Sequence, residues 1–431
     1  MPPETQRSRQ INKVISVPKN LSSVTTYAAS EEVDPREVGM TRDGVEAIWR
    51  GVEKYYRTGV HPALSVCLRR KGQVVLKRAI GHARGNGPGD GPEVEKVLVT
   101  PETPIGQFSA SKAVTAMLVH HLEQTGKIHL TDPVSWYIPE FGQHGKGDVT
   151  ILHVLSHQSG FPQIPAGTDP NMLFDFDGAL KMVCALKPTH PGGHDMSYHA
   201  VTGGFVLGEL IKRVTGKSIQ QYLHDTIQGP LGFRFFSYGV ADEDYPKVAV
   251  NYETGLPILF PFSVIVRRAL GRPFPEILRI TNDPRFYQVV IPSANLVATA
   301  DEMSQFFQLL LDGGERRGVR VFEPLTVRRA TLEAGKMRID STMVLLPMRY
   351  SAGLMLGASP FGMFGPDSER AFGHWGFIKS FSWADPARDI SASILNTGKP
   401  FLGPHLVAHV QLLTLIGKHC PKVPRTLEAS R

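Results

Sequence analysis

Gln-Phe-Ser-Ala-Ser-Lys, residues 107–112, opens a helical pattern that runs on to a stop at Gly126. Residues three apart on a helix share one face, so Ser109 and Lys112 are expected to lie within reach of each other. A serine hydroxyl needs a base to become a good nucleophile, and a lysine can be that base only if its ammonium is destabilised. The helix dipole and partial burial both lower a lysine pKa. The spacing therefore predicts Ser109 as nucleophile and Lys112 as its activating base.

This Ser-x-x-Lys spacing is common by chance, and its other interpretation is a capped helix start followed by a surface lysine. The chain has no Gly-x-Ser-x-Gly motif, so it offers no nucleophile elbow of the α/β-hydrolase type. The rest of the pattern must therefore decide between the two interpretations.

Strand patterns occur on both sides of the nucleophile segment. Alternation at 64–68 and a β-rich run at 74–80 predict one hairpin, and alternation at 381–383 and 390–394 predicts a second. Apolar residues at helical spacing over 45–56 and around 406–413, and a capping box at 299–302, predict further helices. Between the strands, helical segments are expected near 110–125, 150–157, 176–186 and 199–214, and strands return only late.

This order predicts an α+β fold, in which early and late strands pair in one antiparallel sheet flanked by helices and the helical insert forms a second lobe. A cleft between the lobes would hold the active site. The expected division is an N-terminal arm at 1–40, a catalytic domain at 41–420 with an α/β lobe from 41–102 and 291–420 and a helical lobe from 103–290, and a tail at 421–431.

Further motifs follow the Ser-x-x-Lys pair in order. Tyr198 precedes a helical pattern, and His374-Trp375-Gly376 lies where a late strand is expected. Together with the runs at 126–133 and 150–160, these motifs resemble the serine β-lactamase and penicillin-binding superfamily, nearest to class C β-lactamases and the carboxylesterases related to them. The resemblance extends from about residue 45 to residue 416 and implies a class C β-lactamase-like fold.

The resemblance also implies roles for residues outside the Ser-x-x-Lys pair. Tyr198 would share a proton network with the serine and lysine and act as proton shuttle. His374 would line the cleft opposite the nucleophile. The backbone N–H groups of Ser109 and of Phe377, which directly follows Gly376, would stabilise the oxyanion.

Two departures from the family pattern bear on the substrate. The second motif, Tyr-x-Asn in β-lactamases, reads Tyr198-His199-Ala200, so its amide is absent. In the third motif, His374 replaces the lysine that pairs with the carboxylate of a β-lactam. Both changes favour esters without that carboxylate.

We therefore expect a serine hydrolase that cleaves small-molecule carboxylic esters through an acyl-enzyme on Ser109. A β-lactamase, a D,D-peptidase and an acyltransferase are the alternatives within the same fold. A non-catalytic relative that uses the cleft for binding is a different class of alternative, and the intact set of Ser109, Lys112 and Tyr198 argues against it.

The composition is that of an ordinary globular chain. With 431 residues, 42% of them hydrophobic, it can bury a large core. The net charge of +7 and pI near 9.2 arise from 47 basic residues scattered among 40 acidic ones, without a long basic run. Nucleic-acid binding is therefore not expected.

Metal ligands and disulfides are not indicated either. Cys67, Cys184 and Cys420 are too few and too far apart for a disulfide framework or a zinc site. His153 and His157 are four apart on a predicted helix, but no third ligand follows at a suitable spacing, so a structural role is favoured. No metal and no organic cofactor are expected.

Residues 1–20 are polar, interrupted by prolines and without the apolar core of a secretory signal. No run approaches the roughly 18 apolar residues that span a bilayer. These features predict a cytoplasmic protein without a transmembrane segment. The oligomeric state does not follow from the sequence.

One connecting segment is unusually apolar. Residues 256–262 read Leu-Pro-Ile-Leu-Phe-Pro-Phe, and the apolar character continues to the cations Arg267 and Arg268. Such a segment can cover an acyl pocket or touch a lipid surface peripherally. Packing in the core of the helical insert is the favoured interpretation.

Overall fold

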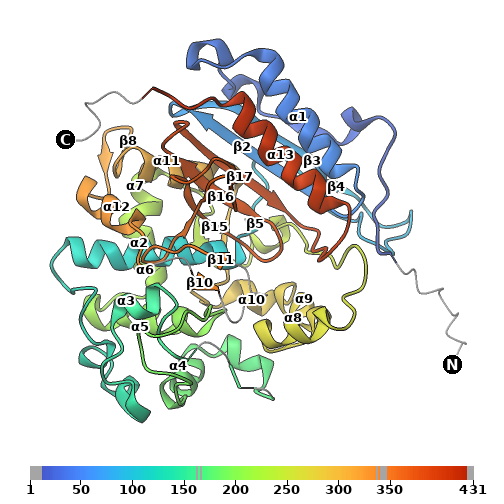
Figure 1. Cartoon of the computed structure of the whole chain (residues 1–431). Helices are drawn as coiled ribbons and strands as arrows, with labels where there is room; N and C mark the ends of the chain where they lie inside the picture. Colours follow the sequence, from blue (N-terminus) through green and yellow to red (C-terminus); the bar gives the residue numbers. More distant parts are fainter. Residues whose placement is uncertain (1–11, 162–163, 166, 336–337, 340–346, 425–431) are drawn as a thin grey trace, which may run out of the picture.

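The computed structural model describes residues 12–161, 164–165, 167–335, 338–339 and 347–424, so part of the predicted arm and the tail 425–431 lie outside the described residues. Its largest element is an antiparallel sheet in the order β1-β3-β2-β17-β16-β15-β12, with β4 paired to β3 (Figure 1). The strands of this sheet are β1 (Thr25–Tyr27), β2 (Ala63–Arg70), β3 (Gln73–Arg84), β4 (Val97–Leu98), β12 (Met355–Leu356), β15 (Phe372–Trp375), β16 (Phe381–Asp385) and β17 (Ile390–Asn396). Because β2 pairs with β17, the predicted union of early and late strands is confirmed.

Helices cover both faces of the sheet. On one face, the first long helix α1 (Arg42–Tyr56) packs against the terminal helix α13 (His405–His419), as Figure 1 shows. On the other face, α11 (Ala300–Leu311) contacts β2, β16 and β17. Successive side chains of β2 point to opposite faces of the sheet and so pack in different layers. Leu64 and Leu68 join the core beneath α1 and α13, whereas Cys67 lies in a different cluster of buried residues.

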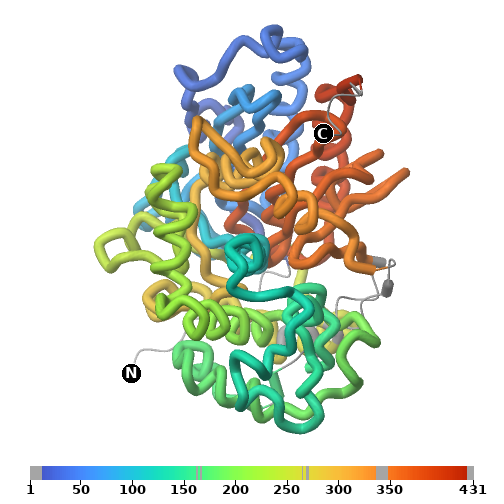
Figure 2. Tube along the Cα trace, turned by 90° about the vertical axis from the view of Figure 1, so that its left-hand side faces the viewer, coloured from blue at the N-terminus to red at the C-terminus, as the bar shows by residue number. Residues whose placement is uncertain are grey.

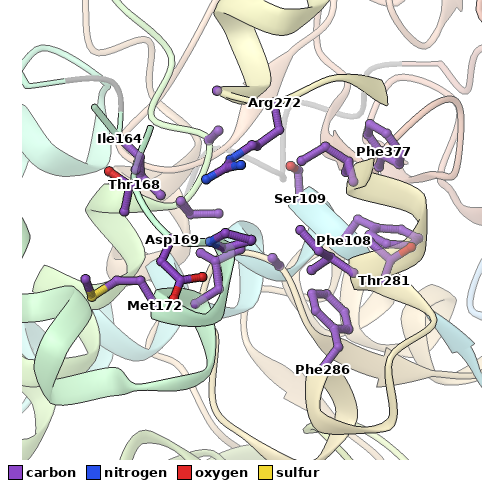
Figure 3. A pocket seen from close by; sticks show the side chains of 18 of the residues that line it. Phe108, Ser109, Ile164, Thr168, Asp169, Met172, Arg272, Thr281, Phe286 and Phe377 are labelled. Atoms are coloured by element: carbon purple, nitrogen blue, oxygen red, sulfur yellow. The ribbon is translucent and has the colours of Figure 1, made fainter. Parts of the chain in front are cut away.

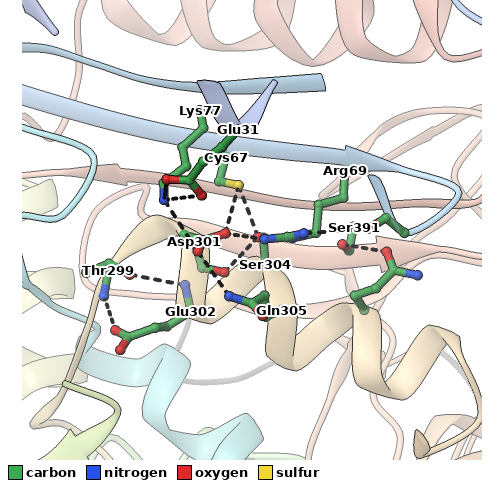
Figure 4. Close-up of polar contacts among 12 residues, drawn as sticks. Glu31, Cys67, Arg69, Lys77, Thr299, Asp301, Glu302, Ser304, Gln305 and Ser391 are labelled. Atoms are coloured by element: carbon green, nitrogen blue, oxygen red, sulfur yellow. Dashed lines mark hydrogen bonds and ion pairs between the residues drawn. The ribbon is translucent and has the colours of Figure 1, made fainter. Parts of the chain in front are cut away.

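A buried polar network fastens α11 to the sheet (Figure 4). The guanidinium of Arg69 pairs with Asp301, and its Nε donates to Ser304 Oγ at 3.0 Å. Lys77 Nζ, on the neighbouring strand, lies 3.6 Å from Asp301 and 2.8 Å from Glu31. Burial raises the pKa of Asp301, but the charges of Arg69 and Lys77 more than offset this, so the net pKa is lowered and the carboxylate stays ionised. The predicted capping box at 299–302 starts this helix.

The chain between the early and late strands forms a mostly helical half. Figure 2 shows the blue and red ends of the described chain together in the upper half of the molecule and the green segments in the lower half. The helices of this half are α2 (Ser111–Gln124), α3 (Ile151–Leu155), α4 (Phe176–Ala185), α5 (Thr202–Thr215), α6 (Ile219–Leu223), α7 (Gly229–Leu231), α8 (Phe262–Leu270), α9 (Phe274–Thr281) and α10 (Pro284–Gln288). Within the described ranges, no helix has both the length and the apolar character required to cross a bilayer.

Short elements complete the fold. Helix α12 (Pro324–Thr331) follows α11 and contacts α2. The remaining strands pair as the small sheets β5 (Ile105–Gly106), β7 (Leu296–Ala298) and β6 (Ser237–Tyr238), β8 (Glu315–Arg316) with β9 (Val319–Arg320), β10 (Arg338–Ile339) with β11 (Pro347–Met348), and β13 (Phe361–Gly362) with β14 (Gly365–Pro366).

Two features differ from the sequence-based prediction. Within the predicted arm at 1–40, β1 pairs with β3, and Leu21 and Val24 are buried, so this part of the arm belongs to the sheet. In addition, β5 lies inside the stretch expected to be helical and joins β7 in a small three-stranded sheet. Strands of two or three residues are too short to show a period of two, which explains why the pattern missed them.

Candidate active site

The serine of the Ser-x-x-Lys pair lies on a tight turn. Ser109 sits in a 3-10 turn, Phe108–Ala110, whose first residue has a φ of +49°. The preceding Gln107 anchors this turn, because its side-chain amide donates to the carbonyl oxygens of Ile105 at 2.7 Å and Ala298 at 3.1 Å. The small sheet of β5 and β7 thus holds the serine at the N-terminal end of α2.

The lysine reaches the serine as its spacing predicted. Lys112 Nζ donates to Ser109 Oγ at 3.2 Å and to the carbonyl oxygens of Ala200 at 2.8 Å and Ser293 at 3.0 Å. Burial of this amine lowers the pKa of Lys112 to about 7. The amine is therefore neutral in a substantial fraction of molecules near neutral pH and can accept a proton.

Tyr198 lies beside this pair. Its ring centroid is 4.9 Å from Lys112 Nζ, and the ring packs on His157 with centroids 4.7 Å apart. The side chain is buried in the core shared by the sheet and helices α1 and α13. The structure thus brings the tyrosine to the serine–lysine pair from a segment almost ninety residues further along the chain.

His374 is a buried, neutral histidine. It lies on β15 and is buried, and its Nδ1 is 2.7 Å from the carbonyl oxygen of Trp375. Burial, and next the charge of Lys112, lower the pKa of His374 to about 3, so the imidazole is neutral. The charge of Lys112 acts on it, so it lies near the serine–lysine pair, and its place in the cleft stays a prediction.

The residues after His374 approach the nucleophile turn closely. A Cβ on Gly376 would lie 2.3 Å from the carbonyl oxygen of Gln107, so only glycine allows this approach. The next residue, Phe377, packs its ring on Phe108 with centroids 5.7 Å apart. Among the described residues, the Phe377 N–H forms no backbone hydrogen bond.

Two further histidines surround the lysine, and the sequence pattern did not identify them as site residues. His157 and His199 are buried, and their rings contact each other with centroids 5.1 Å apart. Burial is the main cause that lowers the pKa of His199 to about 3 and that of His157 well below its usual value, and the nearby Lys112 lowers both further. Neutral imidazoles therefore line the lysine, and no signal within either sequence segment foretells this proximity.

A cavity of about 130 Å³ opens beside Ser109 (Figure 3). Phe108 and Phe377 border the serine, whereas Ile164, Thr168 and Met172 lie across the open space. The lining is mainly apolar, and its charged members are Asp169 and Arg272. Residues from α9 and α10 also contribute to the wall, namely Ile277, Ile280, Thr281 and Phe286.

His153, the first histidine of the pair with metal-ligand spacing, has a structural role. His153 Nδ1 accepts a hydrogen bond from the Thr150 N–H at 3.2 Å and completes a capping box at the start of α3. Among the described residues, no group of three or more histidine, cysteine, aspartate or glutamate side chains is arranged to hold a metal ion.

Comparisons with known proteins show which family and fold this chain resembles. Residues 50–413 match the model of the beta-lactamase family. The chain is 27% identical to the Esterase/beta-lactamase LipL of Mycobacterium tuberculosis over 303 residues, which cover 67% of this chain and 68% of that protein. A crystal structure of a penicillin-binding protein homologue from Caulobacter crescentus superposes with a TM-score of 0.76 at 28% identity, covering 88% of this chain and 99% of that one.

A further solved structure supports the fold. The crystal structure of a family VIII carboxylesterase superposes with a TM-score of 0.73 at 24% identity, covering 89% of this chain and 99% of that one. The antiparallel sheet flanked by helices, together with the helical half, is thus a class C β-lactamase-like α+β fold. Since the family model spans most of the chain, the protein belongs to the beta-lactamase family of serine hydrolases.

Proposed function

We propose that this protein hydrolyses carboxylic esters through an acyl-enzyme formed on Ser109. The observation that carries the proposal is the 3.2 Å contact between Ser109 Oγ and the amine of Lys112, whose pKa burial lowers to about 7. A neutral amine at this distance can remove the hydroxyl proton as the oxygen attacks the ester carbonyl.

In the acylation step, Ser109 Oγ bonds to the carbonyl carbon, and its proton moves to Lys112. The negative charge that develops on the carbonyl oxygen is stabilised by the backbone N–H groups of Ser109 and Phe377. The C–O bond to the alcohol then breaks, and the leaving alkoxide takes a proton that Tyr198 relays from Lys112. Water attacks the acyl-enzyme by the same route in reverse and releases the acid.

Two features support esters as the substrate class. Ala200 contributes only its carbonyl oxygen to Lys112, so the position offers no side-chain amide that could bind a substrate amide. His374 is neutral and buried, so it offers no charge to a substrate carboxylate in the place where the family has a lysine. The mainly apolar cavity beside Ser109 accommodates an acyl chain by excluding water from it.

Activity assays with two chromogenic substrates test the proposal. We expect hydrolysis of p-nitrophenyl butyrate and no turnover of nitrocefin, because the features that recognise a β-lactam carboxylate are missing. Turnover of nitrocefin without ester hydrolysis would instead make the protein a β-lactamase. Product analysis in the presence of an added alcohol separates hydrolysis from acyl transfer.

Labelling with a fluorophosphonate tests the nucleophile itself. The wild-type protein should be labelled covalently, and Ser109→Ala should not, whereas Ser111→Ala provides a matched control two positions away. Absence of labelling in the folded wild-type protein would favour a binding role for the cleft over catalysis.

A further inference from the structure

The apolar segment that precedes α8 does not pack in the core as the sequence favoured. Leu259 is 68% exposed, Phe260 is 82% exposed and Val264, on α8, is 57% exposed. Leu256 and Phe262 are also exposed. These large apolar side chains are exposed within a stretch of nine residues, which is unusual for a surface that contacts only water. Such patches mark contacts with a partner or a membrane.

The opposite side of this segment is buried and faces the catalytic region. Val266 of α8 forms a small apolar cluster with Phe274 and Leu278 of α9, and Ile258 packs against the same cluster. The ring of Phe274 contacts Phe377, with centroids 5.3 Å apart. Residues 256–264, α8 and α9 thus form one unit. One side of this unit supports the loop that carries the proposed oxyanion N–H, and the other side is exposed.

The same unit forms part of the cavity beside Ser109. Gly271 and Arg272, which follow α8, and Ile277 and Ile280 of α9 line that cavity. A second hollow of about 380 Å³ lies within the unit itself, between the 256–264 segment and the start of α9. The exposed apolar surface and the acyl cavity are therefore built from one continuous piece of chain.

The charge of this unit favours an anionic partner. The one acidic residue of this unit, Glu276, lies 2.9 Å from Arg272, and Glu253, which precedes the unit, lies 2.7 Å from Lys13. The exposed Arg267 and Arg279 form no ion pair among the described residues. The charge that remains unbalanced in this unit is therefore positive, and the unit also exposes large apolar side chains. This combination is what binds the surface of an anionic bilayer.

We propose that the protein docks on anionic lipid membranes through residues 256–264 and α8. Leu259 and Phe260 insert among the acyl chains near the headgroups, and Arg267 pairs with lipid phosphates. Docking places the cavity beside Ser109 next to the membrane, so ester-bearing amphiphiles of the bilayer are its substrate source. This last step rests on the proposed esterase function, whereas membrane docking does not.

Co-sedimentation of the full chain with vesicles tests the docking surface. Phosphatidylcholine vesicles with and without about one third phosphatidylglycerol serve as the probe. The wild-type protein should bind the anionic vesicles, and the double variant Leu259→Ser/Phe260→Ser should bind them at least about tenfold more weakly. Arg267→Gln should lower binding about fivefold, on anionic vesicles only.

A matched control uses Leu325, on α12, and Leu332, directly after it, which are 54% and 60% exposed. Figure 1 shows α12 on the left of the molecule and α8 on the right. Leu325→Ser/Leu332→Ser should bind vesicles as the wild type does. All variants should hydrolyse p-nitrophenyl butyrate within about twofold of the wild type, since a dissolved ester needs no membrane. Ester hydrolysis without vesicle binding would overturn the docking proposal and leave the esterase proposal intact. Vesicle binding without ester hydrolysis would overturn the esterase proposal and leave the docking proposal intact.

Two other results would also overturn the docking proposal. One is equal vesicle binding by the wild type and by Leu259→Ser/Phe260→Ser. The other is a concentration-dependent dimer in sedimentation velocity that this double variant abolishes, without vesicle binding, because the face would then bind a second copy of the chain.

Discussion

Two lysines with lowered pKa values lie near the nucleophile turn, Phe108–Ala110. Lys112 contacts Ser109 and is bordered by the neutral histidines His157, His199 and His374. The amine of Lys399 lies 4.7 Å from the ring centroid of Phe108, the residue before the serine. Burial lowers the pKa of each lysine to about 7.

A cluster of three histidines lies near the second lysine, whose charge acts on one of them, His61. His61, His405 and His409 are buried, and burial is the main cause that lowers the pKa of His405 to about 4 and that of His409 to about 3. The pKa of His61 falls well below its usual value, first through burial and then through the charges of its neighbours, including Lys399. The two regions are thus alike in titration behaviour.

The two regions differ in the groups that the lysine amine contacts. Lys112 Nζ lies within hydrogen-bond distance of a hydroxyl that faces a cavity, whereas Lys399 Nζ donates to the carbonyl and side-chain oxygens of Asn396, at 2.9 and 3.2 Å. Lys399 is fully buried and lines no part of the cavity beside Ser109. A lowered lysine pKa is therefore a consequence of burial, and a catalytic base also needs a nucleophile and an open site.

Replacing each lysine gives the largest expected difference. Lys112→Met should lower kcat/KM for p-nitrophenyl butyrate about a thousandfold, because the base is lost. Lys399→Met should leave kcat/KM within about threefold, because methionine retains the apolar stem. A comparable loss in both variants would mean that Lys399 belongs to the catalytic machinery and would remove the distinction.

Replacing Tyr198, which lies beside Lys112, gives the next largest expected effect. Tyr198→Phe should lower kcat about a hundredfold without changing the unfolding transition, because the shuttle for the leaving-group proton is removed. Tyr350 is a matched control, since its ring also packs on His157, with centroids 5.1 Å apart. Equal kcat values for Tyr198→Phe, Tyr350→Phe and the wild type would exclude Tyr198 from the reaction.

The buried histidines of the second region predict acid sensitivity. A pKa of about 3 for His409 in the folded state, against 6.5 usually, means that the unfolded chain binds more protons below pH 6.5. The stability contribution is fully present above pH 6.5 and is lost progressively as the pH falls toward 3. Between pH 7 and 5, each such histidine lowers the free energy of unfolding by about 2 kcal/mol.

Urea unfolding at both pH values measures this effect. His409→Phe should lose about 2 kcal/mol less than the wild type on acidification from pH 7 to 5. His129→Phe, at an exposed histidine, should lose as much as the wild type. Identical losses in all three proteins would show that His409 is protonated in the folded state.

The smallest expected effect is the pH dependence of the rate, which reports the titration of Lys112. The proposed mechanism requires neutral Lys112, so kcat/KM should rise about tenfold between pH 6 and 8, with a midpoint near the pKa of about 7. Lys399→Met should keep this midpoint. A midpoint that moves by a full unit in Lys399→Met would couple the two regions, and a flat profile would mean that Lys112 is not the titrating base.

Much of the fold and part of the site could be predicted from sequence patterns. The hairpin strands at 64–68 with 74–80 and at 381–383 with 390–394 are confirmed as parts of one sheet. The proximity of Ser109 and Lys112 is also confirmed, since it requires only the helical repeat. The roles of these residues and of Tyr198, Gly376 and Phe377 in catalysis stay predictions.

Other features depend on segments that meet only in the folded chain. The acceptors of the Lys112 amine come from Ala200 and Ser293, which are 88 and 181 residues away, and no local repeat encodes such contacts. The burial that sets both lysine pKa values and the exposure of Leu259 and Phe260 are likewise properties of the packed molecule.

The sequence by itself determined the order of the longer strands and helices and the stacking of serine on lysine, because periodicity acts over a few residues. Tertiary structure decided the burial that lowers the pKa of both lysines and which apolar segment stays at the surface. The physical reason is that desolvation depends on how much protein surrounds a group, and that protein comes from distant parts of the chain.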